Sequence, residues 1–208
     1  MKKCMVFLLS AVMAFSLMGC GNNKEPDKEQ GTASSYESAL DVLNTVVDAY
    51  AEDDKFPMGG GDSEHLSMEG PATFDVSKTE ELDTSLGLPK EEAANIDDAA
   101  SLVHMMNANT FTGAAYHVTE GTNMEDFAEA VKEHVLSRQW ICGMPDTLVV
   151  LKADSEYVLT AFGADDLIET FKKNAASSLE TDAFFQYSFF ILFSAPGADF
   201  LLFGSCKI

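Results

Sequence analysis

The side chains in this sequence that could perform chemistry are four cysteines, four histidines and many carboxylates. Cys142 could act as a nucleophile, with His134 as its base and Asp146 as the acid that orients the base. His134 and Cys142 are eight residues apart on one expected helix, which separates them by about 12 Å along the axis. Because a proton transfer needs hydrogen-bond contact, the spacing predicts no catalytic residue here. We interpret Trp140 and Cys142 as core residues at a helix end.

Two histidines, His104 and His117, lie on adjacent expected strands and could hold a metal ion together. If that hairpin turns at residues 107–110, His117 faces Ala100. His104 is then four residues away, about 13 Å along the strand, which is too far for one ion. We expect His65 and His134 to be surface or hydrogen-bonded histidines. The sequence therefore predicts no metal site and no cofactor, and it contains no phosphate-binding glycine loop, HExxH or GxSxG motif.

A loop rich in glycine and carboxylates spans residues 53–75. Calcium is the ligand that such a run suggests, but the ordered spacing of oxygen ligands in a calcium loop is absent. The three consecutive glycines at 59–61 interrupt regular structure. We expect a mobile surface loop, and cation binding stays open as an alternative.

Cys20 is the cysteine with the clearest chemical role. Lys2 and Lys3 precede the apolar run Met5–Leu17, which is typical of an export signal and short for a membrane span. The run ends in Leu-Met-Gly-Cys at 17–20, which resembles the lipobox of bacterial lipoproteins: a branched residue, a variable one, a small one and the acylated cysteine. We predict a signal peptide at residues 1–19 and lipid modification of Cys20, which would anchor the chain to the extracytoplasmic face of the cell membrane.

We expect residues 20–35 to form a tether. This stretch has no large apolar side chains, so it cannot compensate the entropy lost on folding. A flexible coil of this length extends on the order of 20 Å. Without Lys2 and Lys3 the chain has 11 basic and 34 acidic side chains, a net charge of −23. That charge argues against nucleic acid as a partner. Cys142 and Cys206 are too few for a disulfide framework, although a bridge between them stays open.

Residues 36–180 have the size of a single domain. A helix is expected at 35–51, with a capping box of Ser34 and Glu37, and a short helix after Pro89. Two strand–strand–helix units follow, with strands at 100–106, 111–119, 147–152 and 157–162 and helices after Asn123 and from Ala164 to about Asn174. We predict an α+β fold, a two-layer sandwich of an antiparallel sheet with helices on one face.

The chain also resembles a family of small lipoproteins of Gram-positive anaerobes that is known only as a domain of unknown function. The resemblance covers about residues 38–173, and its most specific part is the run Arg-Gln-Trp-Ile-Cys-Gly-Met-Pro at 138–145. Further support comes from Leu-Gly-Leu at 86–88, Met-Met-Asn-Ala-Asn at 105–109, Tyr-Val at 157–158 and Phe-Gly at 162–163. The resemblance implies an α+β fold and surface attachment, and it implies no activity.

The tail at 181–208 has a different composition, since 7 of the 26 residues from Ala183 onward are phenylalanine. One interpretation is a hairpin of strands 189–194 and 200–203 that turns at Pro196-Gly197. Another is translated non-coding sequence, because codons for residues 194–203 can form an inverted repeat followed by a thymidine run. The second interpretation predicts that truncation after Asp182 leaves folding intact.

These observations predict a membrane-anchored extracytoplasmic lipoprotein of unknown activity. A non-enzymatic module that binds a protein or small-molecule ligand, or supports an envelope assembly, is the favoured function. Two alternatives stay open: a hydrolase whose site combines distant residues, and a cation-binding module that uses the acidic loop.

Overall fold

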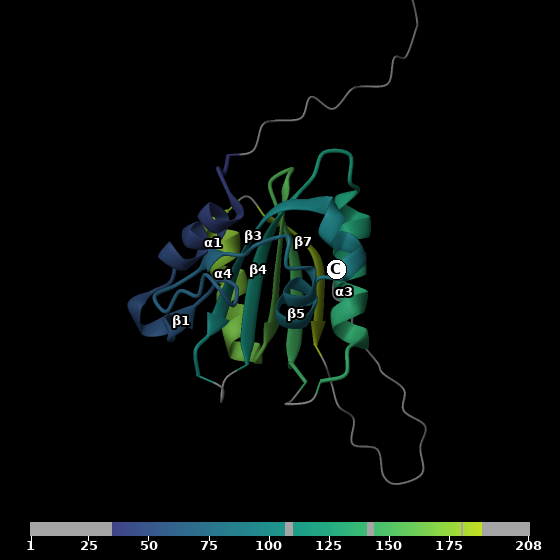
Figure 1. Cartoon of the computed structure of the whole chain (residues 1–208). Coiled ribbons are helices and arrows are strands. Elements are labelled where there is room, and N and C mark those ends of the chain that lie inside the picture. The colour runs from purple at the N-terminus through teal and green to yellow at the C-terminus, as the bar shows by residue number, and fades with distance from the viewer. Residues whose placement is uncertain (1–34, 107–109, 141–143, 180, 189–208) are drawn as a thin grey trace, which may run out of the picture. The chain divides into compact units, whose positions relative to one another are not determined.

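The computed structural model describes residues 35–106, 110–140, 144–179 and 181–188. All of them belong to the second of the two units into which the chain divides after Gly31. Their centre is a seven-stranded antiparallel sheet in the order β1-β3-β4-β6-β5-β7, with β2 paired to β3 beside β1 (Figure 1). The strands are β1 (Met58–Gly59), β2 (Ala72–Thr73), β3 (Ile96–His104), β4 (Phe111–Val118), β5 (Thr147–Ala153), β6 (Tyr157–Gly163) and β7 (Thr181–Ser188).

The helices are α1 (Ala39–Asp48), α2 (Thr79–Glu81), α3 (Met124–Ser137) and α4 (Asp165–Ser178). One π turn (Leu82–Leu86) follows α2, and 3₁₀ turns lie at Glu52–Asp54 and Lys90–Asn95. The α+β class, the antiparallel sheet and both strand–strand–helix units are confirmed. The short helix expected after Pro89 is the second of these 3₁₀ turns.

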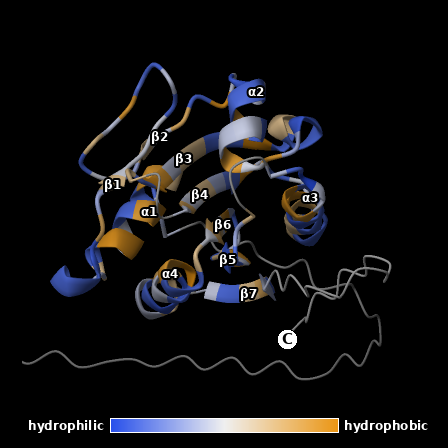
Figure 2. Cartoon of the chain, turned by 90° about the horizontal axis from the view of Figure 1, so that it is seen from below, coloured by the Kyte–Doolittle hydropathy of each residue, from blue (hydrophilic) through white to orange (hydrophobic). Residues whose placement is uncertain are grey.

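Helices cover both faces of the sheet, whereas the sequence predicted a two-layer arrangement with one covered face. Alternate strand residues such as Ala100 and Leu159 pack with α1 and α4, while their neighbours Ala99 and Val158 pack with α3. Figure 2 shows α1 and α4 on one side of the strands and α3 on the other. The reason is that β5 and β6 are buried on both faces, as nearly continuous apolar runs tend to be.

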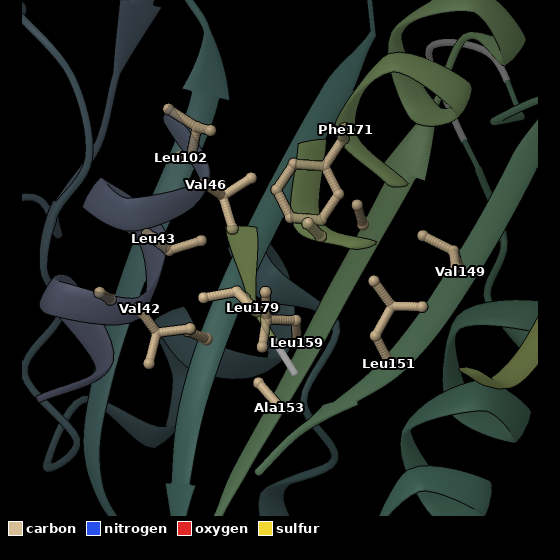
Figure 3. Close-up of a cluster of buried hydrophobic side chains, with 14 of the residues drawn as sticks. Val42, Leu43, Val46, Leu102, Val149, Leu151, Ala153, Leu159, Phe171 and Leu179 are labelled. Carbon is tan, nitrogen blue, oxygen red and sulfur yellow. The ribbon is translucent and has the colours of Figure 1, made fainter. Parts of the chain in front are cut away.

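The core between α1, α4 and the sheet consists of buried hydrophobic side chains (Figure 3). Side chains of α1 and Phe171 of α4 meet alternate residues of four strands. The labelled members are Val42, Leu43, Val46, Leu102, Val149, Leu151, Ala153, Leu159, Phe171 and Leu179. Most of them are fully shielded from solvent, so this layer supplies a large part of the apolar burial that stabilises the fold.

The helix caps were predicted with mixed success. Asn123 caps α3 as expected, since its side chain accepts the backbone N–H groups of Glu125 and Asp126. For α1 the predicted capping box of Ser34 and Glu37 is wrong. Ser38 is the cap and accepts the N–H of Asp41 at 3.1 Å. The helix starts later than expected because the Ala39 N–H donates to Asp98 of β3, a contact that only the tertiary fold creates.

The start of the Phe-rich tail belongs to the sheet, because Thr181–Ser188 forms β7 and pairs along the whole of β5. A register shift between Val150 and Leu151 leaves Phe184 between two paired residues, and Phe184, Phe185 and Tyr187 pack on the α3 side. The folded unit thus continues past the predicted boundary at residue 180. The predicted hairpin at 189–203 lies outside the described residues.

Candidate functional site

The acidic loop is organised around one buried carboxylate, Asp62, whose side chain is only 1% exposed. The Asp62 carboxylate accepts a hydrogen bond from the Lys78 ammonium at 2.7 Å. It also accepts hydrogen bonds from the backbone N–H groups of Glu64, at 2.8 Å, and Asp75, at 3.1 Å. The His65 ring lies 3.1 Å away. The loop between the Glu52–Asp54 turn and α2 is therefore built on this charged centre, which differs from the mobile loop that the sequence predicted.

Electrostatics at Asp62 favour the ionised form. Burial by itself would raise the pKa of this carboxyl, but the Lys78 ammonium and the backbone donors outweigh burial and hold the pKa well below its usual range. The contacts of Lys78 with the Asp62 and Glu64 carboxylates in turn raise the pKa of Lys78. Lys78 thereby occupies the position beside Asp62 where a bound cation would otherwise lie. In the described part of the chain, no group of three or more His, Cys, Asp or Glu side chains could hold a metal ion.

A second charged cluster lies at the end of the sheet where the described chain begins. His117 of β4 forms a very short contact through Nδ1 with Asp97 of β3, and its Nε2 lies 3.7 Å from Glu156. Burial lowers the pKa of His117, but the two carboxylates outweigh it and raise that pKa above its usual range. Burial, together with nearby carboxylates such as Asp98, raises the pKa of Tyr157 to about 12.

The same end of the sheet holds the first described residues. Ser35 N–H donates to Asp154 at 3.3 Å, and Ala39 N–H donates to Asp98 at 2.7 Å. The Tyr36 ring meets Tyr157 edge-on, with ring centroids 6.1 Å apart. Carboxylates of the β3 strand and of the β5–β6 turn therefore fasten the segment that leads in from the N-terminal region.

The two histidines weighed as a metal pair are far apart, as expected, although the register differs. His117 pairs with Asp98, and Ala100 pairs with Ala115, so the hairpin is shifted by two residues from the predicted pairing. His104 lies at the other end of β3, where its ring stacks on Phe56 with centroids 4.9 Å apart. The shift arises because β3 ends at His104 and the connection to β4 begins earlier than residue 107.

The residues of the predicted core at the end of α3 have a mixed outcome. Trp140 is half-buried, packs edge-on against Phe162 with centroids 5.4 Å apart, and has the Arg138 guanidinium 5.0 Å from its ring. His134 is hydrogen-bonded, as expected, with Nε2 2.7 Å from Asp83. Cys20, Cys142 and Cys206 lie outside the described residues, so lipid modification and any bridge stay predictions.

A shallow groove runs between α3, the Lys90–Asn95 turn and β7, with a volume of about 780 Å³. Its lining includes the apolar Leu136, the ring of Tyr187, and the carboxylates of Glu91 and Glu133. Lys132 also lines it, with its ammonium 4.5 Å from the Phe185 ring centroid and 5.2 Å from that of Tyr187. These cation–π contacts, each worth about 0.5–2 kcal/mol, fix β7 against α3. The groove is a candidate site for a ligand. No sequence signal predicted it.

Exposed apolar side chains gather at the opposite edge of the sheet, beside β1. Among the described residues, the large apolar side chains that are exposed are Leu66, Met68 and Met106. Their exposed fractions are 61%, 65% and 56%. The described structure therefore has two candidate surfaces for binding, the groove beside β7 and this edge beside β1. Sequence reasoning found neither, because each combines residues from separate segments.

Comparison with protein-family models, with curated proteins and with solved structures finds no match for this chain. Among the helices of the described ranges, none is long and apolar enough to cross a membrane.

Proposed function

We propose that this protein is a lipid-anchored extracytoplasmic binding protein without enzymatic activity, attached to the membrane through Cys20. The observation that carries the proposal is the Leu-Met-Gly-Cys run at 17–20 behind a basic and apolar signal. A polar stretch follows before the first described contacts at Ser35 and Ala39. That order of segments suits a domain held at a membrane surface through the polar stretch that follows Cys20.

A binding role agrees better with the polar clusters than catalysis does. His65, His117 and His134 contact carboxylates, and the His104 ring accepts the N–H of Met106 at 3.0 Å. A hydrolase with a serine or cysteine nucleophile and a histidine base would instead bring that histidine to the nucleophilic hydroxyl or thiol. The contact of His117 with Asp97 joins β4 to β3, and that of His134 with Asp83 joins α3 to the π turn, so these two support a role in holding the fold.

The alternative of a cation-binding module depends on the acidic loop. There the Asp62 carboxylate already contacts the Lys78 ammonium at 2.7 Å, and Lys78 also lies 3.2 Å from Glu64. A divalent cation would have to displace a lysine held by two carboxylates. This arrangement favours the binding protein over the cation module.

Acyl labelling tests the anchor. Cells that express the protein with Cys20→Ala should lose incorporation of an alkyne-labelled fatty acid and release the protein or retain the precursor. Cys4→Ala is the matched control, because Cys4 lies inside the predicted signal and should leave labelling unchanged. Labelling that persists in Cys20→Ala would refute the anchor.

A further inference from the structure

The edge of the sheet beside β1 is rich in methionine. Met58 of β1 pairs with His104, Met105 N–H donates to Pro57 at 2.8 Å, and Met106 follows it. With Leu66 and Met68 these residues form what we call the methionine edge: Met58, Leu66, Met68, Met105 and Met106. It contains four of the six methionines that follow Cys20. That concentration is notable because methionine adapts to varied apolar partners.

The backbone at Gly59 shows that the segments of the methionine edge are in contact. A Cβ atom at Gly59 would lie 2.2 Å from Met105 Sδ and 2.8 Å from the Ser67 carbonyl oxygen. Ser67 also exchanges two backbone hydrogen bonds with Gly60, at 2.8 and 3.1 Å. The backbone that carries Leu66 and Met68, on either side of Ser67, is therefore held next to Gly59 and Gly60, where the Met105 side chain also lies.

The charges around this edge are mainly negative. Residues 52–69 contain six acidic side chains against Lys55, a net charge of −5 with His65 neutral, which Lys78 beside Asp62 reduces to −4. Glu64 is 71% exposed, and Glu69 is exposed next to Met68. A self-complementary dimer would bring two such edges together, and like charges oppose that contact. Anionic lipid is disfavoured for the same reason.

We propose that the methionine edge binds a segment of another protein in which apolar side chains alternate with lysine or arginine. The apolar side chains would cover Leu66, Met68 and Met106, and the basic side chains would pair with Glu64 and Glu69. The proposal deepens the proposed function and rests on the protein being a binding protein. It names the surface and the chemistry of the partner.

A direct test uses the full chain in phosphatidylcholine nanodiscs and a fluorescent 14-residue peptide of alternating lysine and leucine. Fluorescence anisotropy should show saturable binding that weakens with salt. The triple variant L66S/M68S/M106S should bind about tenfold or more weakly, which corresponds to about 1.4 kcal/mol. The variant E64Q/E69Q should bind about threefold more weakly, since charged groups at the rim of an interface change affinity modestly.

The matched control is E120Q/E125Q, which removes two exposed acidic charges elsewhere and should bind like the parent. Equal binding by the triple variant, absence of binding by the parent, or equal binding of an alternating glutamate–leucine peptide would overturn the proposal. So would displacement of the peptide by phosphatidylcholine vesicles, or a dimer in sedimentation that the triple variant loses. Acyl labelling at Cys20 is measured separately, so failure of the anchor and failure of this surface are distinguishable.

Discussion

Replacing Asp62 with asparagine should destabilise the protein, because Asp62 is the buried centre of the acidic loop. The change keeps the shape of the side chain but removes its charge and turns one acceptor oxygen into a donor. The Asp62 carboxylate accepts Lys78 Nζ at 2.7 Å and the N–H groups of Glu64 and Asp75 at 2.8 and 3.1 Å. At least one of these donors then lacks an acceptor inside the loop.

The expected loss of unfolding free energy is about 2–4 kcal/mol. A hydrogen bond to a charged group contributes about 1.5–3 kcal/mol, and breaking a buried ion pair costs about 3–5 kcal/mol. The upper value is reduced here because Lys78 keeps Glu64 at 3.2 Å and Glu81 at 3.9 Å. For a domain of this size, the melting temperature should fall by about 4–16 °C.

Acid should diminish the difference between Asp62→Asn and the parent. The pKa of Asp62 is lower in the folded protein than its ordinary value of 3.8. A carboxyl group whose pKa is depressed on folding contributes its full stabilisation at a pH above its pKa in the unfolded protein. This contribution declines as the pH falls through 3.8 toward the pKa in the folded protein. The difference in unfolding free energy between the parent and Asp62→Asn should therefore have its full value at pH 7 and be smaller at pH 3.

Urea denaturation followed by circular dichroism at both pH values measures this. Glu69→Gln is the matched control, because Glu69 is exposed in the same loop and its change should stay within about 0.5 kcal/mol. The double variant D62N/K78M gives the coupling between the two side chains. A melting temperature like that of the parent, or a gap that is the same at pH 7 and pH 3, would show that the Asp62 network does not stabilise the loop.

Two further stability predictions concern the end of α3 and the tail. Truncation after Asp182 should lower the unfolding free energy by about 3 kcal/mol relative to truncation after Ser188, since it removes the half-buried Phe184, Phe185 and Tyr187 of β7. If the two truncated proteins melt alike in calorimetry, β7 contributes nothing. Trp140→Ala should cost about 3 kcal/mol, the low end for a large aromatic residue because Trp140 is half-buried, whereas Trp140→Phe should cost less. A Trp140→Ala protein that melts like the parent but loses ligand binding would assign Trp140 to a surface site.

Much of the fold could be predicted because its signals are local. Short, mainly apolar runs mark β4 and β6, and Asn123 caps α3 through donors two and three residues away. These patterns depend on neighbours within a few residues, so they are readable without a fold. The lipobox at Cys20 is likewise a local motif, and its prediction awaits acyl labelling.

The candidate surfaces could not be predicted, because each depends on contacts between distant segments. Asp62 and Lys78 are 16 residues apart and carry no motif that links them. The methionine edge combines the stretches around Met58, Ser67 and Met105, which meet only when β1 pairs with β3. A two-residue difference in hairpin register was enough to hide the contact between His117 and Asp97.

The sequence by itself determined the α+β class, the order of the repeated strand–strand–helix unit, and the segments that form β3, β4, β5, β6, α1, α3 and α4. Only the tertiary structure decided that helices cover both faces, that Thr181–Ser188 completes the sheet, and that Ser38 rather than Ser34 caps α1. The physical reason is the range of the interactions. Periodicity and turn chemistry act between near neighbours, whereas the choice of face, sheet edge and cap depends on which distant segments bury apolar surface together.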